Sequence, residues 1–215
     1  MFKLYDYWRS SAAYRVRIGL NLKGADYQSV PINLLKHEQR GEEYRAINPQ
    51  GRIPALETPE GLITQSLAIL DYLDAKYKDV NPFVPKDAFA RAQVLSFTLT
   101  IAADIHPVDN TSVLARLKKQ FGADEEAIGH WYRHWIAEGF AALEANISKR
   151  PETACAFGET PTLADICLVP QCANGRRYNL DFSPYPRLAA LDARLRQHPA
   201  FVKAAPENQP DAEKG

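Results

Sequence analysis

Three short polar motifs near the start of the chain have side chains suited to binding an anion. They are Arg9-Ser10-Ser11, Ile53-Pro54 and Gln65-Ser66. The first precedes an apolar helical pattern, and a helix N-terminus carries unsatisfied N–H groups and about half a positive charge. A thiolate placed there gains from this field and from a hydroxyl donor, which together lower its pKa below the usual value of about 8.5. The same serines are also typical helix caps, so both interpretations stay open.

The second and third motifs fit an extended, peptide-like ligand. A residue before proline is held extended, and proline at the head of an edge strand leaves the preceding N–H and C=O free for a ligand backbone. Ser66 can hold a carboxylate with its hydroxyl and the free helix N–H groups, while Gln65 can donate to a second polar group. The alternatives are an ordinary trans turn at Ile53-Pro54 and a simple cap at residues 65–66.

Short strands and helices alternate up to about residue 78 and must position these motifs. Alternation and turn residues predict strands over 2–5, 27–32, 53–57 and 62–64. Apolar spacing predicts helices from Ser10-Ser11 to Gly24 and from Ser66 to Tyr77, with a helix or irregular turn over 36–45. The order is βαβ followed by ββα, which indicates a small α/β domain.

Beyond this domain the strand patterns stop. Pro82 and Pro85 indicate a linker over 81–87, and helical spacing follows over 90–105 and 128–147. Thr162 with Asp165 resembles a capped helix start, and Pro186 suits the first turn of a last helix. The sequence therefore predicts a first domain over 1–80, a linker over 81–87 and an all-helical domain over 88–215, with a tail from 206 that frays.

The composition excludes several classes of function. The 215 residues carry 26 Lys+Arg and 26 Asp+Glu, and this zero balance argues against a nucleic-acid partner. The N-terminus has no secretory pattern and no run of about 18 apolar residues is present, so we expect a cytoplasmic chain without a membrane partner. Three cysteines without a C-x-x-C spacing indicate free buried thiols. His130 and His134 have helical spacing but no third ligand, so we expect no metal site.

Several longer motifs occur together in this chain. They are SSAAYRVRIGLNLKG, NPQGRIPALET, QSLAI, DIHPVDNTSVL and TPTLADICLVPQCANGRRYNLDFSPYP. In this combination the chain resembles the zeta class of the cytosolic glutathione transferases, over nearly all of residues 2–205. The resemblance implies a thioredoxin-like N-terminal domain, an all-α C-terminal domain, glutathione as the cofactor, and a homodimer in the cytoplasm.

The resemblance also implies roles for individual residues. Ser10 or Ser11 would stabilise the glutathione thiolate, and Ile53 would pair with the cysteinyl part of glutathione beside a cis-Pro54. Gln65 and Ser66 would hold the γ-glutamyl end. The glutathione site would be completed by Ala12, Gln39, Gln50, His106 and Asn110. Arg9 and Arg177 would hold the substrate carboxylates, since a guanidinium binds a carboxylate in bidentate fashion.

The activity implied by the resemblance is glutathione-dependent isomerisation of 4-maleylacetoacetate to 4-fumarylacetoacetate, in tyrosine and phenylalanine breakdown. Many members of the class have a cysteine where this chain has Ala12, so the reacting sulfur would come from glutathione itself. Alternatives are maleylpyruvate isomerisation, transfer to α-halo acids, and a non-catalytic interaction module. Related maleylpyruvate enzymes place an arginine where this chain has Thr111-Ser112, which favours maleylacetoacetate.

Five further residues have simpler interpretations. Arg15 and Arg17 face different ways on one helix, and we interpret them as surface or interdomain ion-pair residues; the alternative is that one of them reaches the mouth of the active site. Asp165 is interpreted as a helix cap, and Tyr5 and Tyr7 as packing residues.

Overall fold

A computed structural model describes residues 1–212, and these form two compact units. The first contains Met1–Phe83 together with the C-terminal residues from Arg196 onward, and the second is Val84–Leu195. This division differs at the C-terminus from the one predicted from the sequence, which assigned everything after residue 87 to the helical domain. The physical reason is that the last helix, α10 (Pro199–Ala204), packs against α1 (Ser11–Leu22) of the first unit.

The first unit is built on a four-stranded sheet with the order β2-β1-β3-β4. Strand β1 pairs in parallel with β2 and antiparallel with β3, and β3 pairs antiparallel with β4. Its elements besides α1 and α10 are β1 (Phe2–Asp6), β2 (Tyr27–Pro31), η1 (Glu38–Arg40), α2 (Glu42–Ile47), β3 (Ala55–Thr58), β4 (Gly61–Thr64), α3 (Ser66–Lys76) and η3 (Pro206–Asn208). The predicted thioredoxin-like βαβ–ββα order is confirmed.

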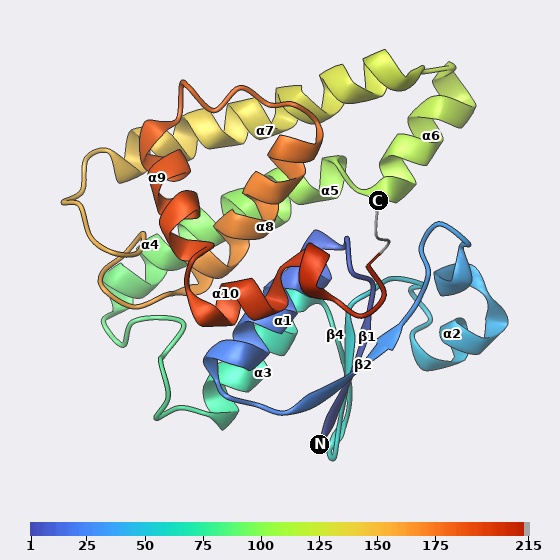
Figure 1. Ribbon diagram of the computed structural model, residues 1–215, viewed down its shortest axis with the longest axis horizontal. Helices are drawn as coiled ribbons and strands as arrows, with labels where there is room; N and C mark the ends of the chain where they lie inside the picture. The colour runs from blue at the N-terminus through green and yellow to red at the C-terminus, as the bar shows by residue number, and fades with distance from the viewer. Residues whose placement is uncertain (213–215) are drawn as a thin grey trace. The chain divides into compact units, whose positions relative to one another are not determined.

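Alternation along the strands gives the sheet two apolar faces. Leu4 and Leu56, which are paired across β1 and β3, are fully buried. Their neighbours Tyr5 and Ala55 point the opposite way, where Tyr44 of α2 packs on them with a Tyr5–Tyr44 ring distance of 5.9 Å. Helices α1 and α3 pack side by side within this unit (Figure 1).

Close packing of α1 on α3 requires a glycine. A Cβ added at Gly19 would lie 2.2 Å from a methyl carbon of Leu70 on α3. The small residue therefore lets the two helices approach each other.

The sequence predicts that the tail from residue 206 frays, and this prediction is wrong for the part up to residue 212. Gln209 is buried, and its Nε2 donates to the carbonyl oxygens of Lys203 at 3.0 Å and Ala205 at 2.8 Å. These bonds fold the chain back after α10. The sequence interpretation failed because polar residues in a tail say nothing about hydrogen bonds they make to a preceding helix.

The second unit is helical throughout, apart from one isolated bridge between Cys155 and Gly158 in its described residues. Its elements are α4 (Ala88–Leu99), the π-helical η2 (Thr100–Ile105), α5 (His106–Val108), α6 (Thr111–Phe121), α7 (Glu125–Ile147), α8 (Leu163–Arg177) and α9 (Pro186–Leu195). The prediction of an all-helical second domain is confirmed. The separate helix α6 was missed; it begins at the capping residue Asn110 and ends at Gly122, whose φ is +66°.

Two expectations about single residues in this unit are also confirmed. The Asp165 carboxylate accepts from the N–H and the hydroxyl of Thr162 at 2.8 and 2.9 Å, which closes a capping box at the start of α8. The three cysteines are free and buried.

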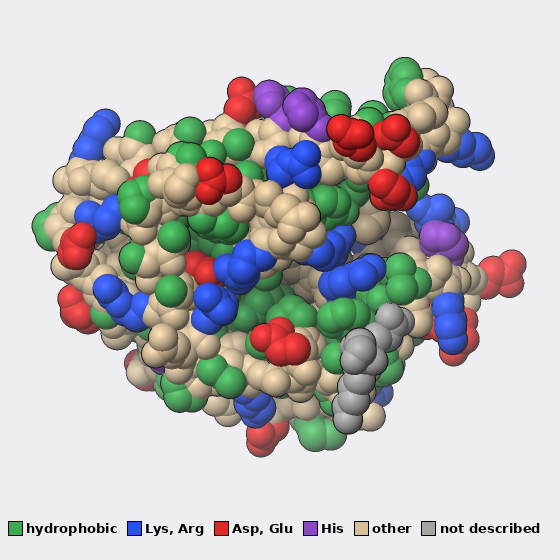
Figure 2. Space-filling view, turned by 45° about the horizontal axis from the view of Figure 1, so that its top comes forward, with side chains coloured by type: hydrophobic (Ala, Val, Ile, Leu, Met, Phe, Trp, Pro, Cys, Tyr) green, Lys and Arg blue, Asp and Glu red, His purple; other side chains and the backbone are tan. Residues whose placement is uncertain are grey.

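By length and composition alone, the helical run over 88–121 is apolar enough to cross a membrane. In the structure α4 and η2 pack against α8, and η2 also packs against α7. Figure 2 shows acidic and basic side chains interspersed over the visible face, in line with the balanced charge of the chain.

Candidate active site

The sheet register brings the three polar motifs to one end of the first unit. Tyr5 pairs with Ala55, and Ala55 pairs with Thr64. The end of β1, the start of β3 and the end of β4 therefore lie at the same end of the sheet. This arrangement places the three motifs in one region: residues 9–11 after β1, 53–54 before β3 and 65–66 after β4.

Ser10 and Ser11 occupy the N-terminus of α1. Ser10 is the N-cap, and its Oγ accepts from the N–H of Ala13 at 3.2 Å. Ser11 is the first helical residue and is buried, as is Ala12 after it. The capping interpretation is therefore correct for Ser10. It leaves the Ser10 hydroxyl hydrogen available as a donor, so capping and anion binding are compatible.

The Ile53–Pro54 peptide bond is cis. The Ile53 side chain packs against the cluster of Tyr5, Tyr44 and Ala55. No backbone hydrogen bond joins Ile53 to another residue in the described part of the chain. Strand β3 lies between β1 and β4, so the sequence-based expectation of an edge strand is wrong. Ile53 precedes the first paired residue of β3, so its N–H and C=O are still backbone groups that a strand-like ligand could pair with at this end of the sheet.

Gln65 has a backbone conformation that is rare for a side-chain-bearing residue, with φ +70° and ψ +119°. It is the N-cap residue of α3, and Ser66 is the first, buried residue of that helix. The Gln65 side chain donates its Nε2 to Oε1 of Gln50 at 3.1 Å, so two of the predicted residues are in direct contact. Such a conformation costs about 1–3 kcal/mol and occurs mainly at functional positions.

Gln39 lies against the turn that carries Gln50. A Cβ on Gly51, whose φ is +60°, would be 2.8 Å from the Gln39 carbonyl oxygen, so only glycine fits this close approach. Gln39 is buried, and its Oε1 has no hydrogen-bond partner among the described residues. A buried amide oxygen without a partner is a group that a donor on a ligand can satisfy.

Arg9 lies in the turn between β1 and α1. Its guanidinium stacks over the indole of Trp8 at 5.6 Å from the ring centroid. No ion pair holds Arg9 among residues 1–212, so its charge is available to an anionic ligand.

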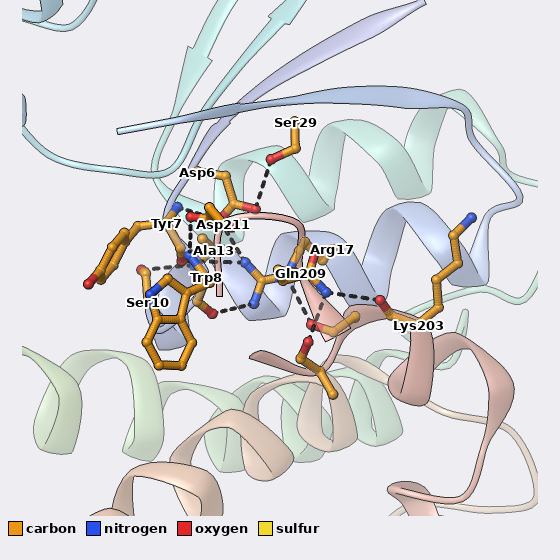
Figure 3. A network of polar contacts seen from close by, with 12 residues as sticks. Asp6, Tyr7, Trp8, Ser10, Ala13, Arg17, Ser29, Lys203, Gln209 and Asp211 are labelled. Carbon is orange, nitrogen blue, oxygen red and sulfur yellow. Dashed lines mark hydrogen bonds and ion pairs between the residues drawn. The ribbon is translucent and has the colours of Figure 1, made fainter. Parts of the chain in front are cut away.

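The surface interpretation of Arg15 and Arg17 is wrong, because both side chains are almost completely buried. Arg17 pairs with Asp6 inside the first unit at 2.7 Å, in the polar network of Figure 3. Arg15 leaves Nε and Nη2 without a partner among the described residues. No sequence signal distinguishes such buried arginines from exposed ones on a helix.

The remaining predicted residues lie in the second unit. His106 is the first residue of α5, and Asn110 caps α6 by accepting from the N–H and hydroxyl of Ser112 at 3.0 and 2.9 Å. Arg177 ends α8; its Nη2 donates to the Tyr178 hydroxyl at 2.9 Å and its guanidinium lies 4.8 Å from that ring. Tyr178 in turn stacks on Tyr132 with 3.7 Å between the ring centroids. Arg177 is therefore exposed, and Tyr178 fixes the direction of its guanidinium. The sequence analysis did not identify Tyr132 or Tyr178 as neighbours of this arginine.

His130 and His134 are exposed on α7, and no group of three metal-ligating side chains occurs among residues 1–212. Tyr5 is buried in the sheet, with its hydroxyl donating to Glu57 at 2.9 Å.

Asp109 is a buried carboxyl that the sequence analysis overlooked. It is 4% exposed, and neither oxygen has a hydrogen-bond partner among the described residues. Burial raises the pKa of this carboxyl from an ordinary value of 3.8 to about 8. The folded chain therefore holds this group protonated at neutral pH, next to the capping residue Asn110.

Replacing Asp109 by asparagine is expected to make stability less dependent on pH. The unfolded carboxyl loses its proton near pH 4 and the folded one near pH 8, so the stability of the natural chain falls as the pH rises between them. The neutral amide needs no proton, so Asp109→Asn should gain on the order of 1–3 kcal/mol at about pH 8 and little at about pH 4. Urea unfolding at the two pH values measures this. A stability difference between Asp109→Asn and the natural chain that is the same at both pH values would contradict this prediction.

A thioredoxin-like sheet with a cis-proline before its third strand, followed by an all-helical unit, is the architecture of the glutathione transferases. The family model for the glutathione S-transferase N-terminal domain matches residues 1–75. A Vibrio cholerae protein named probable maleylacetoacetate isomerase is 46% identical over 97% of each chain.

Two solved structures extend the comparison. A holo maleyl pyruvate isomerase, described as a bacterial zeta-class glutathione S-transferase, is 42% identical with a TM-score of 0.96, covering 98% of this chain and 100% of that one. A maleylacetoacetate isomerase from Methylobacterium extorquens AM1 with bound malonate and glutathione is 34% identical with a TM-score of 0.94, covering 99% and 100%. The chain belongs to the zeta class of the glutathione S-transferases.

Proposed function

We propose that this chain is a glutathione-dependent cis–trans isomerase that converts 4-maleylacetoacetate to 4-fumarylacetoacetate. The observation that carries the proposal is the meeting of the α1 N-terminus, the backbone of Ile53 and the strained Gln65 at one end of the sheet. The relatives named above as isomerases of maleyl diacids support the choice of reaction.

The residues of the first unit fit glutathione. The free backbone of Ile53 suits its cysteinyl part, the helix start at Ser66 suits an α-carboxylate, and the unpartnered Gln39 oxygen suits an ammonium or amide donor. Gln50 and Gln65 would hold the γ-glutamyl end together, through their mutual hydrogen bond. His106 and Asn110 are assigned to the same ligand by the family resemblance.

Bound glutathione supplies a thiolate that adds reversibly to the conjugated double bond, so that rotation about that bond becomes free. The chain contributes by holding charges in place. The N–H groups and hydroxyls at the start of α1 favour the ionised sulfur, and Arg9 and Arg177 hold the two carboxylates of the diacid. Positive charge from these groups also stabilises negative charge that develops on the substrate carbonyl.

The test is an isomerase assay with 4-maleylacetoacetate and with maleylpyruvate, each with and without glutathione. We expect glutathione-dependent turnover that is faster with maleylacetoacetate. Maleylpyruvate isomerisation is the second candidate, favoured by the TM-score of 0.96 to a maleyl pyruvate isomerase. Faster turnover of maleylpyruvate would establish that candidate instead. If the chain isomerises neither substrate and does not bind glutathione-agarose, this result would favour a non-catalytic module.

Three further expectations belong to the proposal. Maleylacetoacetate isomerisation would place the chain in tyrosine and phenylalanine breakdown. We also propose a cytoplasmic homodimer without nucleic-acid or membrane partners, which size-exclusion chromatography with light scattering and cell fractionation would test. Turnover of α-halo acids would draw on the same thiolate.

Substituting Gln65 separates its backbone strain from its side-chain role. Gln65→Ala keeps the unfavourable φ of +70°, whereas Gln65→Gly relieves it, so the glycine variant should be more stable than the alanine variant by about 1 kcal/mol. Both variants remove the bond to Gln50 and the proposed ligand contact, and both should weaken glutathione binding by about 10-fold. Urea unfolding and calorimetric titration with glutathione measure the two effects. Unchanged glutathione affinity in both variants would show that the side chain does not bind the ligand.

A further inference from the structure

We propose that the C-terminal segment, residues 199–212, positions the turn Tyr7–Ser10 and thereby the thiolate-binding end of α1. This inference rests on the proposed function, because it concerns the same glutathione site. Segment and turn lie about 200 residues apart in sequence, but both belong to the first compact unit. Figure 3 shows the polar contacts that join them.

The turn itself is held by side chains from outside it. Its closing bond runs from the N–H of Ser10 to the carbonyl of Tyr7 at 2.9 Å. The N–H of Tyr7 donates to Asp6 Oδ1 at 2.6 Å, and the N–H of Trp8 donates to Asp211 Oδ2 at 3.0 Å. The C-terminal segment thus supplies the acceptor for one backbone group in the middle of the turn.

A single guanidinium links the turn to the same segment from the other side. Arg17 donates its Nη2 to the Trp8 carbonyl and its Nε to the Ala204 carbonyl, each at 2.9 Å. Its Nη1 pairs with Asp6, and the side chain is fully buried. The N–H of Trp8 is therefore bonded directly to Asp211, and the carbonyl of Trp8 is linked through Arg17 to Ala204.

The turn ends at Ser10, the N-cap of α1, so its geometry affects where the Ser10 hydroxyl and the first N–H groups of α1 lie. Electrostatic stabilisation of an anion depends on donors being held in place before the ligand arrives. A displacement of about 1 Å can cost as much as 100-fold in rate. Residues 199–212 contribute no group to the ligand in this scheme; Asp211 acts as a positioning residue through Trp8.

The experiment compares Asp211→Ala, Asp211→Asn and Glu207→Ala in the full chain. Glu207 is an exposed acid of the same segment in η3, so its removal is a matched control for charge. The readouts are kcat, KM for glutathione, the thermal midpoint, and the pKa of the bound glutathione thiol, followed by thiolate ultraviolet absorbance.

We expect Asp211→Ala to lower kcat about 10-fold and to raise the pKa of the bound thiol, since the donors at α1 are no longer held. Asp211→Asn keeps an acceptor oxygen and should restore most of the loss, and Glu207→Ala should match the natural chain. Removing a negative charge without any change of position would lower the thiol pKa. A lowered or unchanged pKa in Asp211→Ala, or a kcat loss that follows only a lower thermal midpoint, would overturn the proposal.

Failure of the proposed function gives a different result. A natural chain that binds glutathione but isomerises neither maleyl substrate would overturn the proposed function, while the thiol pKa would still test the role of Asp211. A natural chain that does isomerise, with Asp211→Ala equally active, would overturn the positioning role alone. A natural chain that does not bind glutathione overturns both.

Discussion

Replacing Ser10 and Ser11 together by alanine is expected to lower kcat by about 10²–10³-fold, with a much smaller loss of glutathione affinity. The two hydroxyls stand at the N-terminus of α1, one as its cap and one as its first residue. Glutathione has many other contacts in the proposed site, which the double variant keeps. In the proposed mechanism the ionised sulfur depends on this one helix end, so the pKa of the thiol should rise in the double variant and the fraction of thiolate at neutral pH should fall.

Loss of the cap must be separated from loss of the hydroxyl donors. Ser10→Ala removes the bond to the Ala13 N–H and should cost about 0.5–2 kcal/mol of stability. Asp124 caps α7 with an equivalent bond to Ala127 at 2.8 Å, so Asp124→Ala is a matched control that should lose similar stability and keep its kcat.

The measurements are steady-state kinetics and the pKa of the bound thiol for the double variant, both single variants and the control. The single variant with the larger rise in thiol pKa identifies the serine that faces the sulfur. A double variant that isomerises at the natural rate would show that neither serine acts on it.

Local patterns predicted the parts of the site that depend on neighbouring residues. A hydroxyl before an apolar helical pattern located the start of α1, and proline after Ile53 located the head of β3 within two residues. These features depend on hydrogen bonds and dihedral preferences within a few residues. The positive φ of Gln65 was not predictable in this way, because glutamine has no preference for it and the surrounding β4–α3 connection imposes it.

Long-range polar contacts were beyond the reach of sequence patterns. Arg17 was interpreted as a surface or interdomain residue, yet it bonds to Ala204, 187 positions away. Asp211 belongs to a tail expected to fray, yet it binds Trp8, 203 positions away. A charged side chain on a helix gives no sign of whether it is exposed or buried with a partner, since that depends on which distant segment packs over it.

Breaking the buried ion pair between Asp6 and Arg17 is expected to produce the largest loss of stability. The Arg17 side chain is 0% exposed and the Asp6 side chain 1% exposed, and their charged atoms lie 2.7 Å apart. Arg17→Met leaves the Asp6 carboxylate buried without a cation, which typically costs about 3–5 kcal/mol. The exposed pair of Lys3 with Glu57 is the matched control, because Lys3→Met should cost less than about 1 kcal/mol.

The pH dependence distinguishes lost charge pairing from lost packing. Burial raises the pKa of Asp6, and Arg17 opposes that shift. Removing Arg17 raises the pKa further, so the folded variant takes up a proton and its stability falls more steeply as the pH rises above the ordinary carboxyl range. Asp6→Asn in the Arg17→Met background removes this charge and keeps an acceptor for the Tyr7 N–H, so the double variant should regain about 1–3 kcal/mol.

Urea unfolding of Arg17→Met, the double variant and Lys3→Met, at mildly acidic and mildly alkaline pH, measures all of these effects. A loss for Arg17→Met that is the same at both pH values would indicate packing alone, and a loss no larger than that of Lys3→Met would show that the buried pair adds nothing.

Because Arg17 also holds the Trp8 carbonyl, Arg17→Met should lower kcat even in the fraction that remains folded. Asp211→Ala should lower kcat with little loss of stability, since Asp211 is only partly buried and Arg17 stays paired. Comparing the two variants therefore separates what the network does for folding from what it does for the turn.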